Sequence, residues 1–241
     1  MTNPIQSRLE QLRERINHAC ARARRPSDSV RLLAVSKTFD ARHLISAILG
    51  RQVEFGENYV QEALPKMETL AALKLQPVWH YIGPMQSNKT RAIAEHFDWA
   101  QTIDRLKVAE RLSTQRPQQR MPLNVCVQVN VSAEQSKSGC TPAEAVALCI
   151  AISRLRGLHL RGLMAIPAPT ADPEQSRPFF RQMRELFDMI RHGGDVDPLA
   201  FDTLSMGMSE DFEVAIEEGA TLVRLGSALF GQRDGSHAPA R

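Results

Sequence analysis

Hydrophobic and polar positions follow two alternating patterns along most of the chain. The apolar residues near the N-terminus recur at helical spacing, which predicts a surface helix with one buried face within residues 1–25. These residues are Ile5, Leu9, Leu12, Ile16 and Cys20. Short apolar runs typical of strands follow at 31–37, 52–55, 77–82, 98–102, 122–131, 157–164, 201–205 and 221–225. Segments with helical spacing lie at 40–50, 57–74, 88–96, 104–116, 141–155, 173–192, 209–219 and 227–230.

Regular alternation of strands and helices is typical of an α/β protein with a parallel sheet. Eight such units in a chain of this length favour a (β/α)8 TIM barrel, preceded by an extra N-terminal helix. Periodicity alone leaves a doubly wound open sheet as the alternative. No low-complexity linker divides the chain, so we expect one domain over 1–241, with a C-terminal tail at 232–241.

Composition narrows the class of protein. The 241 residues are 43% apolar and 24% charged, as in an average globular chain, and the net charge of +3 includes no basic block that would favour nucleic acid. Four dispersed cysteines without a C-x-x-C pair indicate reduced thiols. We find neither an apolar leader nor a run long enough to span a membrane. We therefore expect a soluble, cytoplasmic protein, and a monomer because no long apolar stripe demands a partner.

The loops after the last two predicted strands contain the residue types that bind phosphate. In TIM barrels a phosphate site often lies between these two loops. Glycine lets backbone N–H groups approach an oxyanion, and serine hydroxyls donate hydrogen bonds to it. The alternative is that Ser209 and Ser227 are ordinary helix N-caps. The candidate residues are Ser205, Gly207, Ser209, Gly226 and Ser227.

Lys37 ends the first predicted strand. An amine near apolar surroundings has a lowered pKa and can attack a carbonyl group to form a Schiff base. A lone lysine at a strand end more often extends to solvent, which is the alternative here. A reactive amine opposite a phosphate site, however, is the arrangement that pyridoxal 5′-phosphate (PLP) requires, because PLP has an aldehyde at one end and a phosphate at the other.

Arg224 lies on the last predicted strand between two aliphatic residues. If Val223 and Leu225 pack on helices, Arg224 points into the barrel. A guanidinium group there would donate to the pyridine nitrogen of PLP and weaken the ring as an electron sink. The alternative is an internal salt bridge to a carboxylate such as Glu57.

Other polar residues at predicted strand ends give weaker signals. His80 is either a general base or a packed, hydrogen-bonded histidine. Gln128 and Asn130 are expected to point into the lumen, where each other or a ligand would satisfy them. The histidines have no metal-ligand spacing, so we expect no metal. Methionines that could line a flat ring, or fill the core instead, are Met164, Met206 and Met208.

Six segments together resemble the PLP homeostasis protein family, which is similar to the barrel domain of alanine racemases. The resemblance runs in order from about residue 31 to residue 231. The segments are AVSKT (34–38), FGENYVQE (55–62), WHYIGPMQSNK (79–89), GLMAI (162–166), LSMGMSEDFEVAI (204–216) and VRLGSALFG (223–231).

The resemblance implies a role for each candidate residue. Lys37 would carry PLP as an internal aldimine, Arg224 would face the pyridine nitrogen, and Asn58 would lie beside the cofactor. The phosphate would be held by Ser209, Gly226 and Ser227, with Ser205 as a further possibility. The resemblance also implies a protein without established turnover that buffers PLP or delivers it, with PLP-dependent apo-enzymes as the expected partners.

The sequence also bears on the choice between an enzyme and a carrier. Similar racemases use a second base, a tyrosine from an additional C-terminal domain, whereas this chain stops soon after the expected barrel and contains only Tyr59 and Tyr81. We therefore expect a PLP-binding protein without catalytic residues, with a racemase-like enzyme as the alternative. Lys137, in the loop after strand five, is a candidate acceptor of PLP during transfer, although a solvated lysine is the simpler interpretation.

Overall fold

Eight parallel strands pair in sequence order and close on themselves, because β8 pairs with β1. The structure is a computed structural model that describes residues 3–132, 138–168 and 170–231. Its closed order confirms the predicted TIM barrel and excludes the open doubly wound sheet. The strands are β1 (Arg31–Val35), β2 (Glu54–Glu57), β3 (Val78–Tyr81), β4 (Trp99–Ile103), β5 (Leu123–Val129), β6 (Leu158–Ala165), β7 (Thr203–Ser205) and β8 (Leu222–Leu225).

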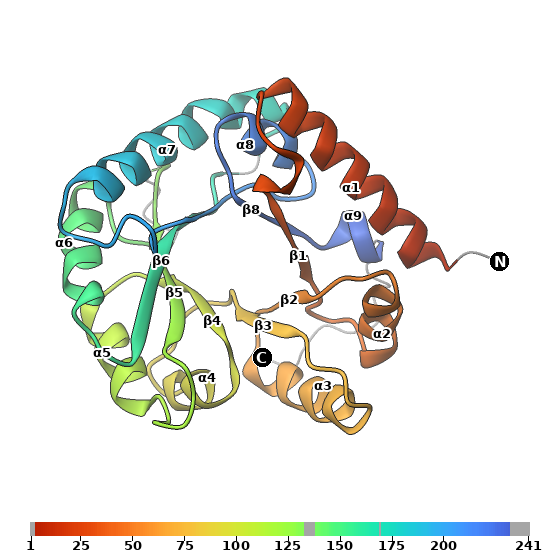
Figure 1. Ribbon diagram of the computed structural model, residues 1–241, viewed down its shortest axis with the longest axis horizontal. Helices are drawn as coiled ribbons and strands as arrows, with labels where there is room; N and C mark the ends of the chain where they lie inside the picture. Colours follow the sequence, from red (N-terminus) through yellow and green to blue (C-terminus); the bar gives the residue numbers. More distant parts are fainter. Residues whose placement is uncertain (1–2, 133–137, 169, 232–241) are drawn as a thin grey trace.

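Helices form a ring outside the strands (Figure 1). The first helix lies on the outside of the ring, where it contacts the helices that follow β1, β7 and β8. It begins after Asn3, whose side chain accepts a hydrogen bond from the N–H of Ile5, and it buries the predicted apolar stripe. The helices are α1 (Pro4–Arg22), α2 (Ala41–Leu49), α3 (Val60–Ala72), α4 (Thr90–His96), α5 (Leu106–Gln115), α6 (Pro142–Ser153), α7 (Arg177–His192), α8 (Phe212–Glu217) and α9 (Ser227–Phe230), with short 3₁₀ turns η1 (Ser27–Ser29) and η2 (Pro173–Ser176).

Several element boundaries differ from the predictions. The second strand begins at Glu54 rather than 52 and extends past the predicted end at 55, because Glu57 still pairs with Tyr81 of β3. The first strand ends at Val35, so Lys37 lies in the following turn. The helix predicted at 209–219 begins only after Asp211, whose carboxylate accepts a hydrogen bond from the N–H of Met208 in the preceding turn.

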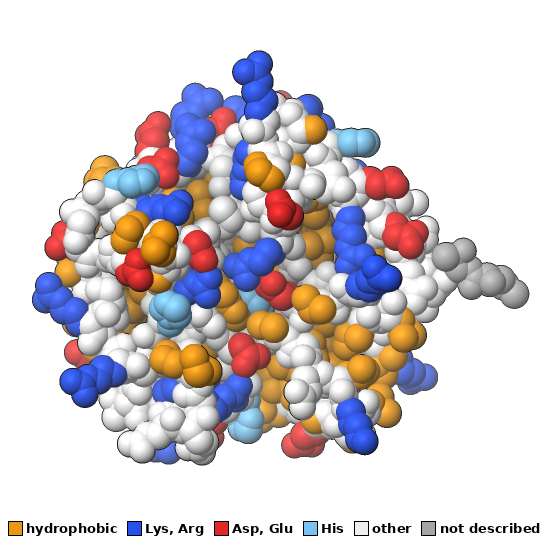
Figure 2. Space-filling view, in the orientation of Figure 1, with side chains coloured by type: hydrophobic (Ala, Val, Ile, Leu, Met, Phe, Trp, Pro, Cys, Tyr) orange, Lys and Arg blue, Asp and Glu red, His pale blue; other side chains and the backbone are white. Residues whose placement is uncertain are grey.

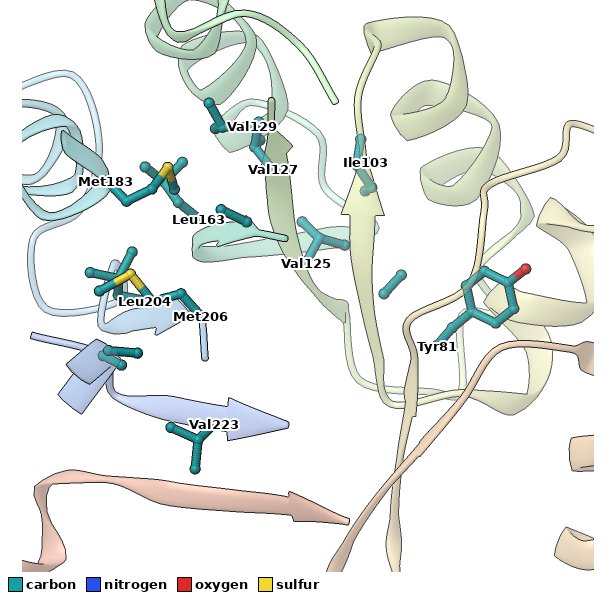
Figure 3. Packing of buried hydrophobic residues seen from close by; sticks show 14 of the residues in the cluster. Tyr81, Ile103, Val125, Val127, Val129, Leu163, Met183, Leu204, Met206 and Val223 are labelled. Carbon is teal, nitrogen blue, oxygen red and sulfur yellow. The ribbon is translucent and has the colours of Figure 1, made fainter. Parts of the chain in front are cut away.

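The main core lies between the barrel wall and the surrounding helices (Figure 3). The alternate apolar residues of β5 face outward, as the alternation predicts: Val125, Val127 and Val129 belong to the same cluster as Met183 of α7. A separate small cluster fills part of the lumen, and it consists of Trp99, Cys126 and Met164. The four cysteines are free thiols, and burial raises the pKa of Cys126 to about 12.

Basic and acidic side chains are interspersed over the face shown in Figure 2 rather than gathered into one basic field. Among the described residues, no helix is both long and apolar enough to cross a membrane.

A bulge in β6 depends on Gly162. The register with β5 passes from Val125–Leu160 to Cys126–Gly162, so Arg161 has no residue opposite it. Gly162 has φ of +152°, and a Cβ there would lie 1.8 Å from the carbonyl oxygen of Thr203. The bulge therefore requires glycine.

Gly162→Ala should lower the free energy of unfolding by at least about 2 kcal/mol, because the added methyl group forces β6 and β7 apart. Urea unfolding followed by circular dichroism measures this change. Gly193→Ala, at a negative φ of −70° at the C-terminus of α7, is the control and should change stability by less than about 0.5 kcal/mol. Equal effects of the two substitutions would contradict the role given to the bulge.

Candidate functional site

A cavity of about 670 Å³ opens where the strands end. This is the end of a TIM barrel at which active sites and cofactor sites lie. Six of the seven residues that the family resemblance assigns to the cofactor line this cavity. They are Lys37, Asn58, Ser209, Arg224, Gly226 and Ser227.

Lys37 reaches the cavity from the turn between β1 and α2. The next residue, Thr38, has φ of +71°, a left-handed conformation that is unfavourable for a β-branched residue. Such strain persists only where surrounding contacts hold it, and it is common at functional sites. The backbone on the C-terminal side of Lys37 is therefore held in one unusual conformation.

Asn58 follows β2 at the cavity wall. Its Oδ1 atom is buried and, among the described residues, has no hydrogen-bond partner. Gly83 fixes the position of this loop, since a Cβ at residue 83 would lie 2.0 Å from the Asn58 carbonyl oxygen. A buried acceptor without a partner costs free energy, so the Asn58 amide is suited to contact a ligand with an N–H or O–H group.

The serine hydroxyls after β7 and β8 lie on the same cavity. Ser209 Oγ accepts a hydrogen bond from the N–H of Ala228 at 3.3 Å, which joins the two loops. The hydroxyl proton of Ser209 remains a possible donor to a ligand. Neither Ser209 nor Ser227 is an N-cap, because α8 is capped at Asp211 and α9 at Gly226. The alternative interpretation of these serines as helix caps is therefore wrong.

Gly207 has a structural role rather than a place at the cavity. Its φ is +92°, and a Cβ there would lie 2.6 Å from the Cβ of Ala215 in α8. The residue therefore allows α8 to pack closely against the loop after β7.

Arg224 is buried at the cavity and donates two hydrogen bonds. One nitrogen of its guanidinium group donates to Ser205 Oγ and another donates to the carbonyl oxygen of Ala165, both at 2.8 Å. Burial lowers the pKa of Arg224 to about 10, so the group is still a cation at neutral pH. The alternative of a salt bridge to Glu57 is wrong, because Glu57 is paired with Lys66.

A chain of hydrogen bonds continues from Arg224 through the lumen. Ser205 Oγ donates to Gln101 Oε1 at 2.6 Å, and Gln101 Nε2 lies 2.9 Å from His80 Nδ1. The other ring nitrogen of His80 lies 3.2 Å from Glu54 Oε2. Ser205 contacts Arg224 and Gln101. It does not line the cavity, unlike the other six residues that the resemblance assigns to the cofactor.

The direction of these bonds assigns the tautomer of His80. Because Gln101 Oε1 accepts from Ser205, its Nε2 group is the donor to His80 Nδ1, which leaves the proton of the neutral ring on Nε2. Burial lowers the pKa of His80, and the nearby Glu54 carboxylate opposes that shift. The ring also stacks on Trp99, with centroids 5.0 Å apart, so His80 is a packed histidine that lies in the lumen.

Two buried polar residues near the site were not identified from the sequence. Lys66 lies on the same buried face of α3 as Ala63 and Leu70. Its position within this apolar stripe could have indicated a buried lysine. Gln101 lies within a strand whose residues are all buried. Its signal was a polar amide within an apolar run.

The remaining candidates lie elsewhere or belong to the core. Gln128 donates to the carbonyl oxygen of Ser138, so a neighbouring loop satisfies it. Met208 lines the cavity, whereas Met164 and Met206 are core residues. Lys137 and the tail at 232–241 lie outside the described residues. No group of three or more potential metal ligands occurs within the described ranges.

Comparison with known proteins identifies the class of protein first. Residues 7–234 match the family model of the alanine racemase N-terminal domain. A structure from Bifidobacterium adolescentis, described as an unknown protein, has a TM-score of 0.87 and 35% identity, covering 94% of each chain. PipY from Synechococcus elongatus, solved with PLP bound, has a TM-score of 0.79 and 34% identity, covering 94% of this chain and all of that one.

Curated relatives then identify the particular family. Proteins named pyridoxal phosphate homeostasis protein from Pseudomonas aeruginosa and Pasteurella multocida are 53% and 48% identical over 230 residues. These alignments cover 95% of this chain and 96% and 98% of the two relatives. The chain therefore belongs to the pyridoxal phosphate homeostasis protein family.

The state of His80 gives a prediction about pH. Because the pKa of His80 is lower in the folded state than its usual 6.5, the unfolded chain takes up the proton first as pH falls. The free energy of unfolding should therefore decrease below about pH 6.5 and continue to decrease toward the lowered pKa. When urea unfolding is measured between pH 8 and pH 5, the free energy of unfolding should decrease less for His80→Gln than for the wild type. If the free energies of unfolding of the wild type and His80→Gln differ by the same amount at every pH, the result would contradict a neutral His80.

Proposed function

We propose that this protein binds PLP in the cavity at the ends of the strands, as a Schiff base on Lys37. The observation that carries the proposal is the convergence of an amine, two serine hydroxyls, a buried guanidinium group and an unpartnered amide oxygen on one cavity. This set of groups fits PLP, which presents an aldehyde, a phosphate and a ring nitrogen. The PLP-bound relative PipY and the names of the curated relatives support the same ligand.

Each residue has a separate task in this proposal. Lys37 Nζ attacks the aldehyde carbon, a C=N bond replaces C=O, and the carbonyl oxygen leaves as water. The phosphate is held by Ser209, Gly226 and Ser227, in the loops after β7 and β8. Asn58 contacts the bound cofactor through its amide.

Arg224 is assigned to the ring nitrogen. Its donors to Ser205 and Ala165 fix the guanidinium plane, and a guanidinium group has further N–H donors to offer. Since Arg224 does not give up its proton at neutral pH, it keeps the ring nitrogen unprotonated and limits the ring as an electron sink. Ser205 acts here as a positioning residue for Arg224 rather than as a phosphate ligand.

We propose storage and delivery of PLP rather than efficient turnover. Racemisation requires a second base on the opposite face of the cofactor. Tyr59 is exposed, Tyr81 donates its hydroxyl to the carbonyl oxygen of Pro84, and neither lines the cavity. In this proposal the protein acts as a monomer in the cytoplasm and supplies PLP to apo-enzymes that depend on it.

Addition of PLP to the purified protein should produce a yellow Schiff-base absorption band that borohydride removes. Lys37→Ala should lose the band, because its side chain has no amine with which to form the imine. An ultraviolet–visible spectrum measures it. Lys89→Ala, a substitution of a half-buried lysine that follows β3 and does not line the cavity, is the matched control and should keep the band. A band of wild-type intensity in Lys37→Ala would overturn the assignment.

Exchange of the α-proton of alanine in deuterated water separates a carrier from a racemase. We expect the protein to exchange this proton no faster than the same concentration of unbound PLP, because the described cavity presents no tyrosine as a second base. Proton NMR of L-alanine and D-alanine follows the exchange. A rate well above that of unbound PLP, abolished by Lys37→Ala, would establish the racemase alternative.

A further inference from the structure

Helix α3 contacts the backbone on both sides of Lys37. Lys66 Nζ donates to the carbonyl oxygen of Ser36 at 2.9 Å. One helical turn earlier, Glu62 Oε2 accepts a hydrogen bond from the N–H of Thr38 at 3.1 Å. The two side chains lie four residues apart on α3, so they project from the same face of the helix. The peptide groups that flank Lys37 are therefore held by one rigid element.

A buried ion pair strengthens the contact before Lys37. Lys66 Nζ lies 2.7 Å from Glu57 Oε1, and the same oxygen accepts the hydroxyl of Ser36 at 2.6 Å. Glu57 is fully buried and Lys66 is 9% exposed. Hydrogen bonds between charged groups at such depth are strong when complete and costly when one partner is missing. The Ser36 backbone is thus fixed through both its side chain and its carbonyl group.

The contact after Lys37 stabilises a strained residue. The left-handed conformation of Thr38, with φ of +71°, is unfavourable for threonine and needs an external partner. Glu62 supplies that partner through a charge-assisted hydrogen bond to the Thr38 N–H. Without it, the turn after Lys37 would relax toward an ordinary conformation and alter the direction of the lysine side chain.

We propose that Glu57, Glu62 and Lys66 are positioning residues that direct the amine of Lys37 toward an aldehyde in the cavity. The inference rests on the proposed function, because it gives these residues a role in forming the Schiff base. None of the three lines the cavity, so they act through the backbone of residues 36–38 rather than through contact with the ligand.

The test compares variants by the rate at which the Schiff-base band appears after mixing with PLP in a stopped-flow spectrometer. Glu62→Met removes the acceptor of the Thr38 N–H while keeping a side chain of similar length, so it should slow the appearance of the band. The double variant Glu57→Gln/Lys66→Met removes the ion pair without leaving a buried charge unpaired, so it should still fold. Because a displacement of about 1 Å can cost up to roughly 10²-fold in rate, we expect the double variant to be about tenfold slower. The single variant Lys66→Arg keeps a cation beside Glu57, so its rate should lie between that of the double variant and that of the wild type.

Glu68→Gln on α3 and Lys107→Met on α5 are the controls, because both residues are exposed. Their rates should equal that of the wild type. Equal rates in the positioning variants and the wild type would overturn the inference.

A second ligand separates positioning of the amine from general damage. Pyridoxine 5′-phosphate has the same ring and phosphate as PLP but an alcohol in place of the aldehyde. Its affinity should be unchanged in Glu62→Met and in the double variant. General damage would weaken this affinity by the same factor as the rate, and that result would refute the positioning role. If the wild type itself forms no Schiff-base band, the proposed function fails, and that result is distinct from any difference among variants.

Discussion

Closure of the barrel is the constraint on which the rest of the structure depends. Eight parallel strands in a closed ring send alternate side chains into a lumen where polar groups must satisfy one another. The lumen contains a directed chain, in which Arg224 donates to Ser205, Ser205 to Gln101 and Gln101 to His80, while Glu54 Oε2 lies 3.2 Å from the far ring nitrogen. The chain can run in this direction because a guanidinium group only donates and a carboxylate only accepts. It holds Arg224 fixed at the cavity.

A helix outside the barrel holds the neighbouring part of the cavity, the turn after β1, in a comparable way. Lys37 lies in a turn rather than in a strand, so strand pairing does not hold it in place. Its flanking peptides instead contact Glu62 and Lys66 of α3. The guanidinium group is thus held from inside the barrel and the amine from outside it. The two groups that the proposed function assigns to PLP therefore line one cavity and have separate supports.

Much of the fold and most of the cavity lining could be predicted from the sequence, for identifiable reasons. The alternation of strands and helices requires only local periodicity. Because the ends of parallel strands meet in any barrel, Lys37 and Ser209 could be grouped from the sequence, and the family resemblance added Asn58. The partner of Ser205 could not be predicted. Its contact with Gln101 joins residues 104 positions apart and depends on the stagger between strands. The same holds for Lys66, whose partner Glu57 lies on a strand that was predicted to end two residues too early.

The most direct test of the central claim is to locate the site of the Schiff base in the native chain. The protein is incubated with PLP, reduced with borohydride and digested, and the modified peptide is identified by mass spectrometry. We predict that the phosphopyridoxyl group is found on Lys37, at close to one group per chain. Modification mainly at another lysine such as Lys89 would contradict the account. So would the absence of modification under conditions in which PLP and borohydride label a free amine in solution.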